Sequence, residues 1–551
     1  MGFSPFATLR SSPRRLVGAA FAALLSAGCA GEGSSLPAAG PPPVTSTAAI
    51  VSVTFTMNWA VVAQSSQRSP RYVPATARSV SISVNGKTPL FLNAPASSLA
   101  IDAPVGNDSF AFATYDGQNG QGNVLSRATV TKTIQLSVAN TVSAVLGGVV
   151  ASLAISLGNP SPNAGVAATV PVNVAARDAD GNTIVGPGDY SAPVTLALAI
   201  PLASEAGRAS LSTTALPNPA TSATLTYGGG TLSRATVTAS STGVASVSAT
   251  FAPKPTVYEF AIPTAGNRPQ WIAAGSDGNM YFTESPGNRV GRITPAGVVT
   301  ECPAVPTAAS NPQGIVGATD GNLWFTEFGA SNITRMTTAC AYTEFSTLFA
   351  SDQPQLLVDR GDGNVWYTGF SGNHVGFQGL TTGTSGETTI PTANSRPYGI
   401  ASSPDNNLYF TESAVDQIGR IPMLFGAITE ITLAVGSTPQ QIVRGPDGLL
   451  YFTESGTSRI GQLDPNAFTV SNEFPTLTAS AQPVGITPGQ DGALWFTQSG
   501  LDRIGRVSTT GTMTDVLVPT TGAGVKGIFS APDGSLYFCE SNTNKIGRLV
   551  Y

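Results

Sequence analysis

A short pattern, Pro-x-Gly-Ile or a close variant, occurs seven times and supplies most of the residues that could do chemistry. Its variable second position holds Gln270, Gln313, Gln355, Tyr398, Gln440, Val484 and Lys526. Amide and phenol groups donate and accept hydrogen bonds, but they are poor bases near neutral pH. Lys526 could serve as a base only with a strongly lowered pKa. We therefore expect these residues, Val484 excepted, to bind a ligand and predict no catalytic residue.

A second repeated group is the glutamate that ends the pattern Leu-Tyr/Trp-Phe-Thr-Glu. It is present in five copies, with Gly369 and Gln498 in the other two: Glu284, Glu327, Glu412, Glu454 and Glu540. We expect these glutamates to stand outside the amide ring on the same face of the fold. An amide ring with outer carboxylates could bind sugars, peptides or a divalent cation.

An arginine of the pattern Ile-Gly-Arg follows most of these glutamates by eight residues and supports a structural alternative. The third copy has lost both partners, with Gly369 and Phe377 in their places, while the fifth and sixth copies each keep one. Joint loss of this kind predicts a Glu–Arg contact within or between repeats. The sequence leaves both roles open and favours the structural one.

The chain has a single histidine, His374, which argues against catalysis by Ser-His-Asp or Cys-His groups. Ser-His-Asp and Cys-His catalysis would both have to use this residue. In the aligned repeats its position holds exposed polar groups such as Arg289 and Gln417. One histidine and four cysteines also exclude histidine-cluster metal sites, zinc ribbons and a dense disulfide framework. We predict no metal ligand.

The composition limits the partners that the chain can bind. Charged residues make up 11% of the 551 positions, against about 25% in an average protein. The net charge is −5, and no run of basic residues is present. Nucleic-acid binding requires a basic surface, so we expect none.

The N-terminus, residues 1–29, resembles the signal peptide of a bacterial lipoprotein. Three arginines precede an apolar run of ten residues, Leu16 to Leu25. Ten residues suit a signal peptide, whereas a membrane-spanning helix needs about 20. The run leads into Leu25-Ser26-Ala27-Gly28-Cys29, which resembles a lipobox, with Cys29 as the residue that would carry the lipid. Simple secretion is the alternative. Residues 30–48, rich in Pro, Ala, Ser and Thr, predict a tether.

Two blocks of alternating apolar and polar residues follow, at 49–157 and 158–254. Short strands at about ten-residue spacing with Gly- and Asn-rich turns predict a β-sandwich in each block. The second block resembles bacterial immunoglobulin-like modules. Its turn Asp178-Ala179-Asp180-Gly181-Asn182 has calcium-loop spacing, but Thr183 stands where such a loop needs glycine. We expect a hairpin turn there.

Residues 255–551 contain seven copies of one unit. An aspartate of a tight turn marks each copy, and successive aspartates lie 42 to 44 residues apart, from Asp277 to Asp533. A period of 40–45 residues with four strand patterns per unit predicts a β-propeller, here with seven blades. The final copy lacks its fourth strand, and a spare strand stands at Val257–Phe260. We expect this strand to complete the last blade and close the ring. The chain as a whole is thus predicted to be all-β, with two immunoglobulin-like sandwiches and a propeller.

These repeats resemble the virginiamycin B lyase (streptogramin lyase) family. The similarity rests on Pro312-Gln313-Gly314-Ile315, on Asp320 to Glu327 and on the corresponding residues of the other copies. The resemblance implies a seven-bladed propeller and a carbon–oxygen lyase that opens a cyclic depsipeptide by elimination, with magnesium as cofactor. It also implies histidines at the second position of Pro-x-Gly-Ile in two successive blades.

The chain departs from the family at those positions, since none of the seven is histidine. The residues two places earlier include no carboxylate to hold magnesium: Arg268, Asn311, Gln353, Arg396, Thr438, Gln482 and Gly524. We therefore expect a noncatalytic, lipid-anchored envelope protein, at the outer membrane or cell surface, whose propeller binds a small molecule, glycan or peptide. The alternatives are a magnesium-dependent lyase and a purely structural envelope protein. No cofactor is expected outside the lyase alternative.

Three cysteines lie in the propeller region. Cys302 and Cys340 fall in or beside the outer strands of adjacent units, and Cys539 replaces the threonine of a Phe-Thr-Glu strand. A disulfide between Cys302 and Cys340 is compatible with an exported protein. Buried free thiols are the alternative.

Overall fold

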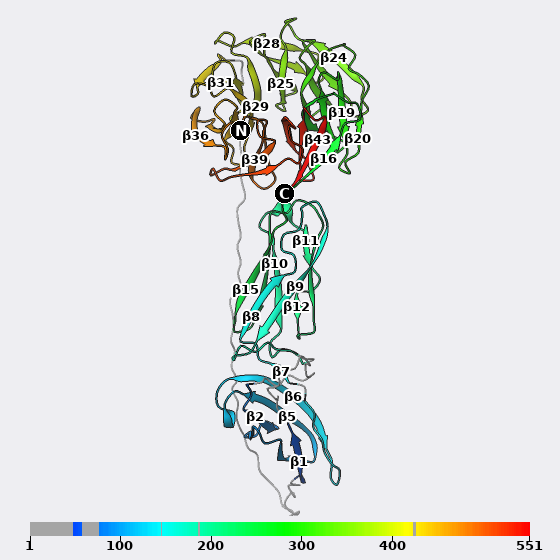
Figure 1. Ribbon diagram of the computed structural model, residues 1–551, viewed down its shortest axis with the longest axis vertical. Helices are drawn as coiled ribbons and strands as arrows, with labels where there is room; N and C mark the ends of the chain where they lie inside the picture. The colour runs from blue at the N-terminus through cyan, green and yellow to red at the C-terminus, as the bar shows by residue number, and fades with distance from the viewer. Residues whose placement is uncertain (1–47, 58–75, 145, 186–187, 423–425) are drawn as a thin grey trace, which may run out of the picture.

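The computed structural model describes residues 48–57, 76–144, 146–185, 188–422 and 426–551. These residues form β-strands and connecting loops, with two short 3₁₀ turns at Gln118–Gly120 (η1) and Ala203–Glu205 (η2). The predicted signal peptide, Cys29 and nearly all of the tether lie outside the described residues. Within the described part, no helix is long and apolar enough to cross a membrane. Three β-units follow one another along the molecule (Figure 1).

The first unit is a two-stranded and a five-stranded sheet that enclose one core. Alternating residues supply that core, including Val53, Ile82 and Phe110, each 0% exposed. The sheet orders are β1-β4 and β3-β2-β5-β6-β7. The strands are β1 (Ile50–Thr56), β2 (Ser79–Val84), β3 (Leu90–Asn93), β4 (Ser98–Pro104), β5 (Gly106–Tyr115), β6 (Val124–Ile134) and β7 (Gly147–Gly148).

The second unit consists of two four-stranded sheets around a core that includes Leu225, Tyr227 and Val237. Their orders are β12-β10-β14-β15 and β11-β13-β9-β8. The strands are β8 (Ser152–Leu157), β9 (Ala168–Arg177), β10 (Val194–Ala199), β11 (Ala209–Leu211), β12 (Ala215–Leu216), β13 (Ala223–Tyr227), β14 (Ala235–Ser241) and β15 (Val244–Phe251).

Strand β8 corrects the expected boundary at residue 157. It pairs with β9 from Ser152↔Arg177 to Leu157↔Val172, and Leu153 lies in the core of the second unit. The junction therefore falls between β7 and β8. Alternation within β8 predicted a strand correctly, but a local pattern does not specify which sheet the strand joins.

Residues 256–550 form seven four-stranded antiparallel sheets, which we number blades 1 to 7 (Figure 1). The first strand of each blade lies against the first strand of the next, and β17 lies against β41, so the inner strands form a closed ring. The blade core comes from the apolar-aromatic second strands, among them Phe282, Phe325 and Phe410 at 0% exposure. The arrangement is that of a β-propeller.

The strands of each blade are given from the inside outward. Blades 1 to 3 are β17 (Pro269–Ala274), β18 (Met280–Glu284), β19 (Arg289–Ile293), β20 (Val299–Glu301); β21 (Pro312–Gly317), β22 (Leu323–Glu327), β23 (Asn332–Met336), β24 (Tyr342–Ser346); and β25 (Pro354–Asp359), β26 (Asn364–Gly369), β27 (His374–Gly379), β28 (Ser385–Thr389).

Blades 4 to 7 follow the same order. They are β29 (Pro397–Ser402), β30 (Leu408–Glu412), β31 (Gln417–Ile421), β32 (Thr429–Thr432); β33 (Pro439–Arg444), β34 (Leu450–Glu454), β35 (Arg459–Asp464), β36 (Thr469–Pro475); β37 (Pro483–Pro488), β38 (Ala493–Gln498), β39 (Arg503–Ser508), β40 (Met513–Leu517); and β41 (Val525–Ser530), β42 (Leu536–Glu540), β43 (Lys545–Val550), β16 (Thr256–Ala261).

The expected closure of the ring is present. Strand β16, which precedes blade 1 in the sequence, pairs with the last strand β43 from Thr256↔Val550 to Ala261↔Lys545. The two ends of the repeat region therefore complete blade 7 together. This pairing covers the edge that β43 would otherwise expose.

Each blade joins two faces of the propeller. Inner strands begin at the Pro-x-Gly-Ile pattern and end at the Asp-Gly turn, as in β17 from Pro269 to Ala274. We call the face with the Pro-x-Gly-Ile ends the mouth face, and the face with the Asp-Gly turns the turn face.

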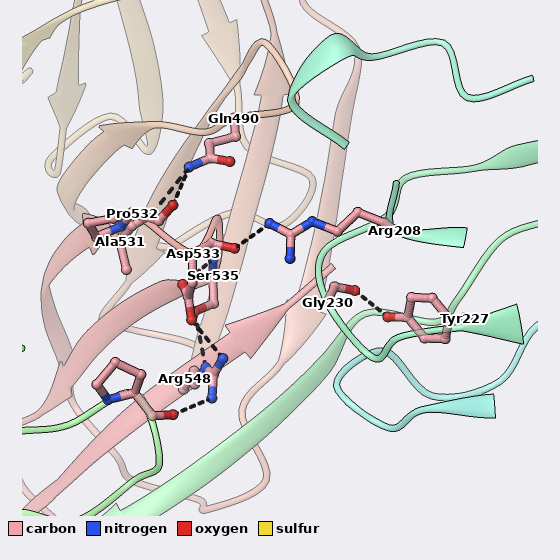
Figure 2. Close-up of polar contacts among 10 residues, drawn as sticks. Arg208, Tyr227, Gly230, Gln490, Ala531, Pro532, Asp533, Ser535 and Arg548 are labelled. Atoms are coloured by element: carbon pink, nitrogen blue, oxygen red, sulfur yellow. Dashed lines mark hydrogen bonds and ion pairs between the residues drawn. The ribbon is translucent and has the colours of Figure 1, made fainter. Parts of the chain in front are cut away.

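The second unit contacts the turn face at blade 7 (Figure 2). Arg208 donates from Nη2 to the carbonyl oxygen of Asp533 over 3.1 Å, and the amide of Leu232 donates to the carbonyl of the C-terminal residue Tyr551 over 3.0 Å. Arg548 holds the same turn from inside the blade through Asp533 and Ser535. The mouth face consequently lies on the side of the propeller opposite these contacts.

Candidate functional site

The second residues of Pro-x-Gly-Ile lie together at the mouth face, each at the start of an inner strand. Gln270 and Gln355 are buried, at 6% exposure each, whereas Gln313, Tyr398, Gln440, Val484 and Lys526 are partly exposed. The structure therefore places the six residues predicted from the sequence, together with Val484, in one ring. We call this ring the mouth.

Threonines of the second strands fix the mouth backbone. Strand pairing is irregular between Pro and Ile of each pattern, as between Pro312 and Ile315, so backbone groups there lack ladder partners. Thr326 supplies the missing partners. Its Oγ1 accepts a hydrogen bond from the amide of Gly314 over 2.9 Å, and it donates one to the carbonyl of Gln355 in the next blade over 2.9 Å. The corresponding threonine of every blade from 1 to 6 donates in the same way.

The backbone just before the mouth has the same unusual conformation in every repeat. The residue before each Pro-x-Gly-Ile pattern has a positive φ, between 46° and 59°: Arg268, Asn311, Gln353, Arg396, Thr438, Gln482 and Gly524. Only one of the seven is glycine, so the repeat holds six side chains in a conformation that L-residues seldom adopt. Since all seven share it, this geometry belongs to the fold rather than to a single site.

Lys526 and Gln270 meet where blade 7 joins blade 1. Lys526 Nζ donates to Gln270 Oε1 over 2.5 Å, and Gln270 Nε2 donates to the carbonyl of Arg268 over 2.8 Å. Burial lowers the pKa of Lys526, the buried Cys539 thiol acts in the opposite direction, and the charge of Arg268 lowers the pKa further. Lys526 is thus the one mouth residue with some character of a base.

An apolar floor closes the mouth toward the channel of the propeller. The rings of Trp271 and Tyr398 lie 6.4 Å apart between centroids, and Leu356 and Val484 belong to the same cluster. Burial raises the pKa of Tyr398 to about 12, so this phenol stays neutral and serves only in hydrogen bonds. Below the floor lies a cavity of about 260 Å³, lined mainly by apolar residues of the inner strands, such as Ile315 and Ile442, and also by Ser402, Gln441 and Arg444.

Two phenylalanines at the mouth face were not expected from the sequence. Phe328 and Phe370 directly follow the second strands of blades 2 and 3, with ring centroids 6.1 Å apart, and both are partly exposed. The guanidinium carbon of exposed Arg396 lies 5.6 Å from the Phe370 ring. The other five repeats have serine at this position, so alignment of the repeats could have revealed the pair.

The five strand-ending glutamates are not solvent-facing carboxylates. Glu284, Glu327, Glu412, Glu454 and Glu540 are all 0% exposed. Asn267 donates from Nδ2 to Glu284, and Thr334 and Asn332 donate to Glu327. The expectation of an outer carboxylate ring open to ligands is therefore wrong in its exposure, because these side chains are buried against neighbouring residues of their own blades.

Burial makes these carboxyls hard to ionise. It raises the pKa of Glu284 and Glu412 to about 8, with the nearby Glu301 and Glu430 adding to the shift. Burial likewise raises the pKa of Glu327 and Glu540 to about 7 and that of Glu454 above its usual value. Glu412 has both carboxyl oxygens buried without a hydrogen-bond partner among the described residues.

Blade 3 keeps a carboxyl in this place although its glutamate has been lost. A Cβ built on Gly369 would meet Asp352 Oδ1 at 1.9 Å, so the aspartate fills the space of the missing side chain. Asp352 is 0% exposed, and burial raises its pKa to about 7. In blade 3 the buried carboxyl thus comes from the loop between β24 and β25 instead of from the end of the second strand. In blade 6 the neutral Gln498 stands at the position of the glutamate.

The predicted Glu–Arg contact is also wrong. In the hairpin of blade 1, Glu284 lies opposite Arg289, and Arg292 lies opposite Tyr281. Tyr281 is three residues from Glu284 along the strand, so Arg292 and Glu284 are about 10 Å apart. The arginines of Ile-Gly-Arg instead reach the aspartate of the Asp-Gly turn or a threonine of the fourth strand. Arg506 Nε lies 2.7 Å from Asp491 Oδ2, and Arg548 Nη2 lies 2.8 Å from Asp533 Oδ2.

His374 lies in the third strand of blade 3 and not in the mouth. Its ring stacks on Phe349 with centroids 4.4 Å apart, and its Nδ1 lies 3.7 Å from Asp352 Oδ1. Burial lowers its pKa. The expectation that this histidine has a structural role agrees with its position.

The mouth does not fit a magnesium ion. Magnesium prefers carboxylate and water oxygens, but the ring has amide, phenol, amine and aliphatic side chains, and the nearby glutamates are buried with raised pKa values. Over the described residues, no group of three His, Cys, Asp or Glu side chains could hold a metal ion. The turn at Asp178 is a hairpin turn, in which Asp178 Oδ1 accepts from the amides of Asp180 and Asn182.

Cys302 and Cys340 form a disulfide between blades 1 and 2, with their Cα atoms 5.6 Å apart. This resolves the alternative between a disulfide and free thiols in favour of the disulfide. Cys539 is a buried free thiol, and burial raises its pKa well above the usual value. It is therefore unsuited to act as a nucleophile.

The solved structures similar to this chain include virginiamycin B and streptogramin B lyases. The virginiamycin B lyase of Staphylococcus aureus is 28% identical with a TM-score of 0.51, over 54% of this chain and 100% of that one. A streptogramin B lyase is 29% identical with the same TM-score, over 54% and 97% of the two chains. A catalytically inactive histidine-to-alanine variant of the S. aureus enzyme with quinupristin matches equally, at 28% identity. No curated protein sequence matches significantly.

A family model adds the sequence evidence. The model of the Virginiamycin B lyase family matches residues 245–381 and 377–551, which together are more than half of the chain and include all seven blades. The propeller fold, the repeat pattern and this match agree. The chain belongs to the virginiamycin B lyase family.

Proposed function

We propose that this protein is an exported, lipid-anchored envelope protein whose seven-bladed propeller binds a ligand at the mouth without catalysing a lyase reaction. Two immunoglobulin-like sandwiches and a tether would hold the propeller away from the membrane. The ligand is a small molecule, a glycan or a peptide. The anchor is a lipid on Cys29, and the outer membrane or cell surface is the proposed location.

The observation that carries the proposal is the side-chain chemistry of the mouth. Glutamines, Tyr398 and Lys526 surround an apolar floor, and Phe328, Phe370 and Arg396 add an aromatic and cationic edge. Such a surface offers hydrogen bonds and stacking to a ligand. A histidine-to-alanine variant of the S. aureus enzyme is catalytically inactive. This chain's one histidine lies outside the mouth.

Export is supported by two independent features. The N-terminal 29 residues have the pattern of a lipoprotein signal peptide, and Cys302 pairs with Cys340 in the propeller. Structural disulfides are characteristic of oxidising compartments outside the cytoplasm.

A magnesium-dependent lyase is the second candidate, favoured by family membership and by Lys526. A lysine with a lowered pKa at the mouth could remove a proton from a substrate. Against it stand the absence of histidine from the ring and the poor fit of the ring to magnesium.

Arrays of glycans and peptides probed with the purified protein test the binding proposal. Phe370→Ala should weaken a retained probe about two- to tenfold, since stacking on an aromatic ring contributes roughly 0.5–1.5 kcal/mol beyond the area that it buries. Phe468→Ala is the matched control, because Arg420 lies over Phe468, 4.3 Å from its centroid, in a pair outside the mouth. Retention of no probe, or equal binding by the Phe370 variant, would reject a binding function at the mouth.

A further inference from the structure

A second pocket lies on the turn face, away from the mouth. It has a volume of about 760 Å³ and is formed where blades 3, 4 and 5 meet. Its walls are more polar than apolar, and they are formed by Arg360, Gly361, Asp362, Ser402, Ser403, Pro404, Asn406 and Arg444. The second unit contacts this face at the turn of blade 7, around Asp533, and so at a different part of it.

The two arginines are departures from the repeat. Arg444 ends the inner strand of blade 5, at a position where five of the other repeats have Ala, Gly, Ser or Pro and blade 3 has Asp359. Arg360 begins the turn of blade 3, where the others have Gly, Ala or Ser. The fold itself therefore does not require a guanidinium at either place. Both departures fall in the same pocket.

Arg360 is held in position by its own surroundings. It donates to the carbonyl of Asn406 in blade 4, and its Nη1 lies 3.6 Å from Asp362 Oδ2. Asp362 also accepts from the amide of Asn364 over 3.0 Å and from Trp366 Nε1 over 3.1 Å. The carboxylate of Asp362 thus already accepts hydrogen bonds from donors of its own turn and strand.

Arg444 and Ser403 have unused hydrogen-bonding capacity. Arg444 is exposed, and the described residues provide it with neither an ion pair nor a side-chain hydrogen bond. Ser403 is 8% exposed, and its Oγ is buried without a hydrogen-bond partner in the described part of the chain. A buried hydroxyl without a partner costs about 1–3 kcal/mol, so a ligand that supplied a partner would be favoured.

We propose that this pocket binds an anionic sugar, meaning a hydroxyl-rich molecule that carries a carboxylate or phosphate group. The guanidinium of Arg444 fits the paired oxygens of such an oxyanion. Ser402 and Ser403 match the hydroxyl groups of a sugar, and the volume is within the range of small-molecule sites. The chain as a whole carries a charge of −5, so this local positive charge distinguishes the pocket from its surroundings.

Isothermal titration calorimetry on the full mature protein, with glucuronate, glucose 6-phosphate and neutral glucose, tests this proposal. At least one anionic sugar should bind with a Kd of about 1 mM or tighter, and more weakly as salt is raised. Glucose should bind at least tenfold more weakly. The tighter of the two anionic sugars identifies the preferred oxyanion.

Variants locate the binding. Arg444→Gln should weaken it about tenfold or more, and Ser403→Ala should weaken it several-fold. Arg335→Gln removes the same charge from blade 2, where the guanidinium only approaches Thr343 at 3.4 Å, and should leave binding unchanged. Binding of neither anionic sugar, equal binding of glucose, or equal binding by Arg444→Gln would overturn the proposal. Because the mouth variants lie on the opposite face, this result is independent of the mouth's function.

Discussion

At the scale of single residues, the buried carboxyls make stability depend on pH. Glu412 has a pKa of about 8 in the folded state, whereas the pKa of a glutamate in the unfolded chain is 4.5. Between these two pH values the folded protein keeps the proton that the unfolded chain has lost. The folded state then binds more protons, so the free energy of unfolding falls as pH rises through this window. We predict a melting temperature that is highest near pH 5 and falls between about pH 5 and 8.

Substitutions that exchange glutamate and glutamine between blades 4 and 6 test whether these carboxyls cause the pH dependence. Glu412→Gln copies the neutral Gln498 and should flatten the pH dependence, while Gln498→Glu should steepen it. Thermal unfolding measured by circular dichroism from pH 5 to 8.5 checks both. Identical slopes in wild type and both variants would show that these carboxyls ionise normally in the folded protein.

At the scale of strands, the threonine ties between blades hold the mouth in place. Thr326→Val keeps the shape but leaves the amide of Gly314 and the carbonyl of Gln355 without their partner. Buried groups left in this way cost about 1–3 kcal/mol. We therefore expect a lower urea midpoint with an unchanged m-value.

Thr343→Val is the control for that measurement. Thr343 is exposed on β24 and accepts only a weak bond from Arg335, so its loss should change stability by less than about 0.5 kcal/mol. Equal midpoints for the two variants would mean that the tie contributes nothing to the inter-blade contact.

Sequence patterns predicted the strands of the repeats and the completion of blade 7, because alternation, turn residues and a fixed period are local signals. Contacts between side chains were harder to predict from the sequence. Glu284 and Arg292 belong to the same hairpin, but its register places them apart. Asp352 replaces the missing carboxyl of blade 3 through space, and no spacing in the sequence indicates that exchange.

The mouth was predictable in part for the same reason. Its ring follows from the repeats, since equivalent positions of a closed array must lie together. The aromatic pair Phe328 and Phe370 differs from the repeat consensus, and only the structure shows that adjacent blades bring the rings together. Burial of the glutamates depends on tertiary packing within the blades, which local sequence does not encode.

At the scale of the whole molecule, the proposed orientation starts from the N-terminus. The second unit contacts the propeller at the turn of blade 7, so a chain anchored at Cys29 would hold the propeller beyond the first and second units (Figure 1). Only a thiol at position 29 can accept the diacylglycerol of a lipoprotein. Cys29→Ser should therefore abolish metabolic labelling with a radioactive fatty acid, and equal labelling of both proteins would contradict the anchor.

The central claim is that this propeller has the fold of its family without the family's lyase chemistry. Incubation of the purified protein with virginiamycin B in magnesium buffer, with the S. aureus lyase as positive control, tests it most directly. Loss of a general base alone typically lowers a rate 10²–10⁴-fold. We predict that the lactone stays intact over times in which the control linearises it fully. Linear product at a rate comparable to the control, and its loss in Lys526→Met, would contradict the claim and identify Lys526 as the base.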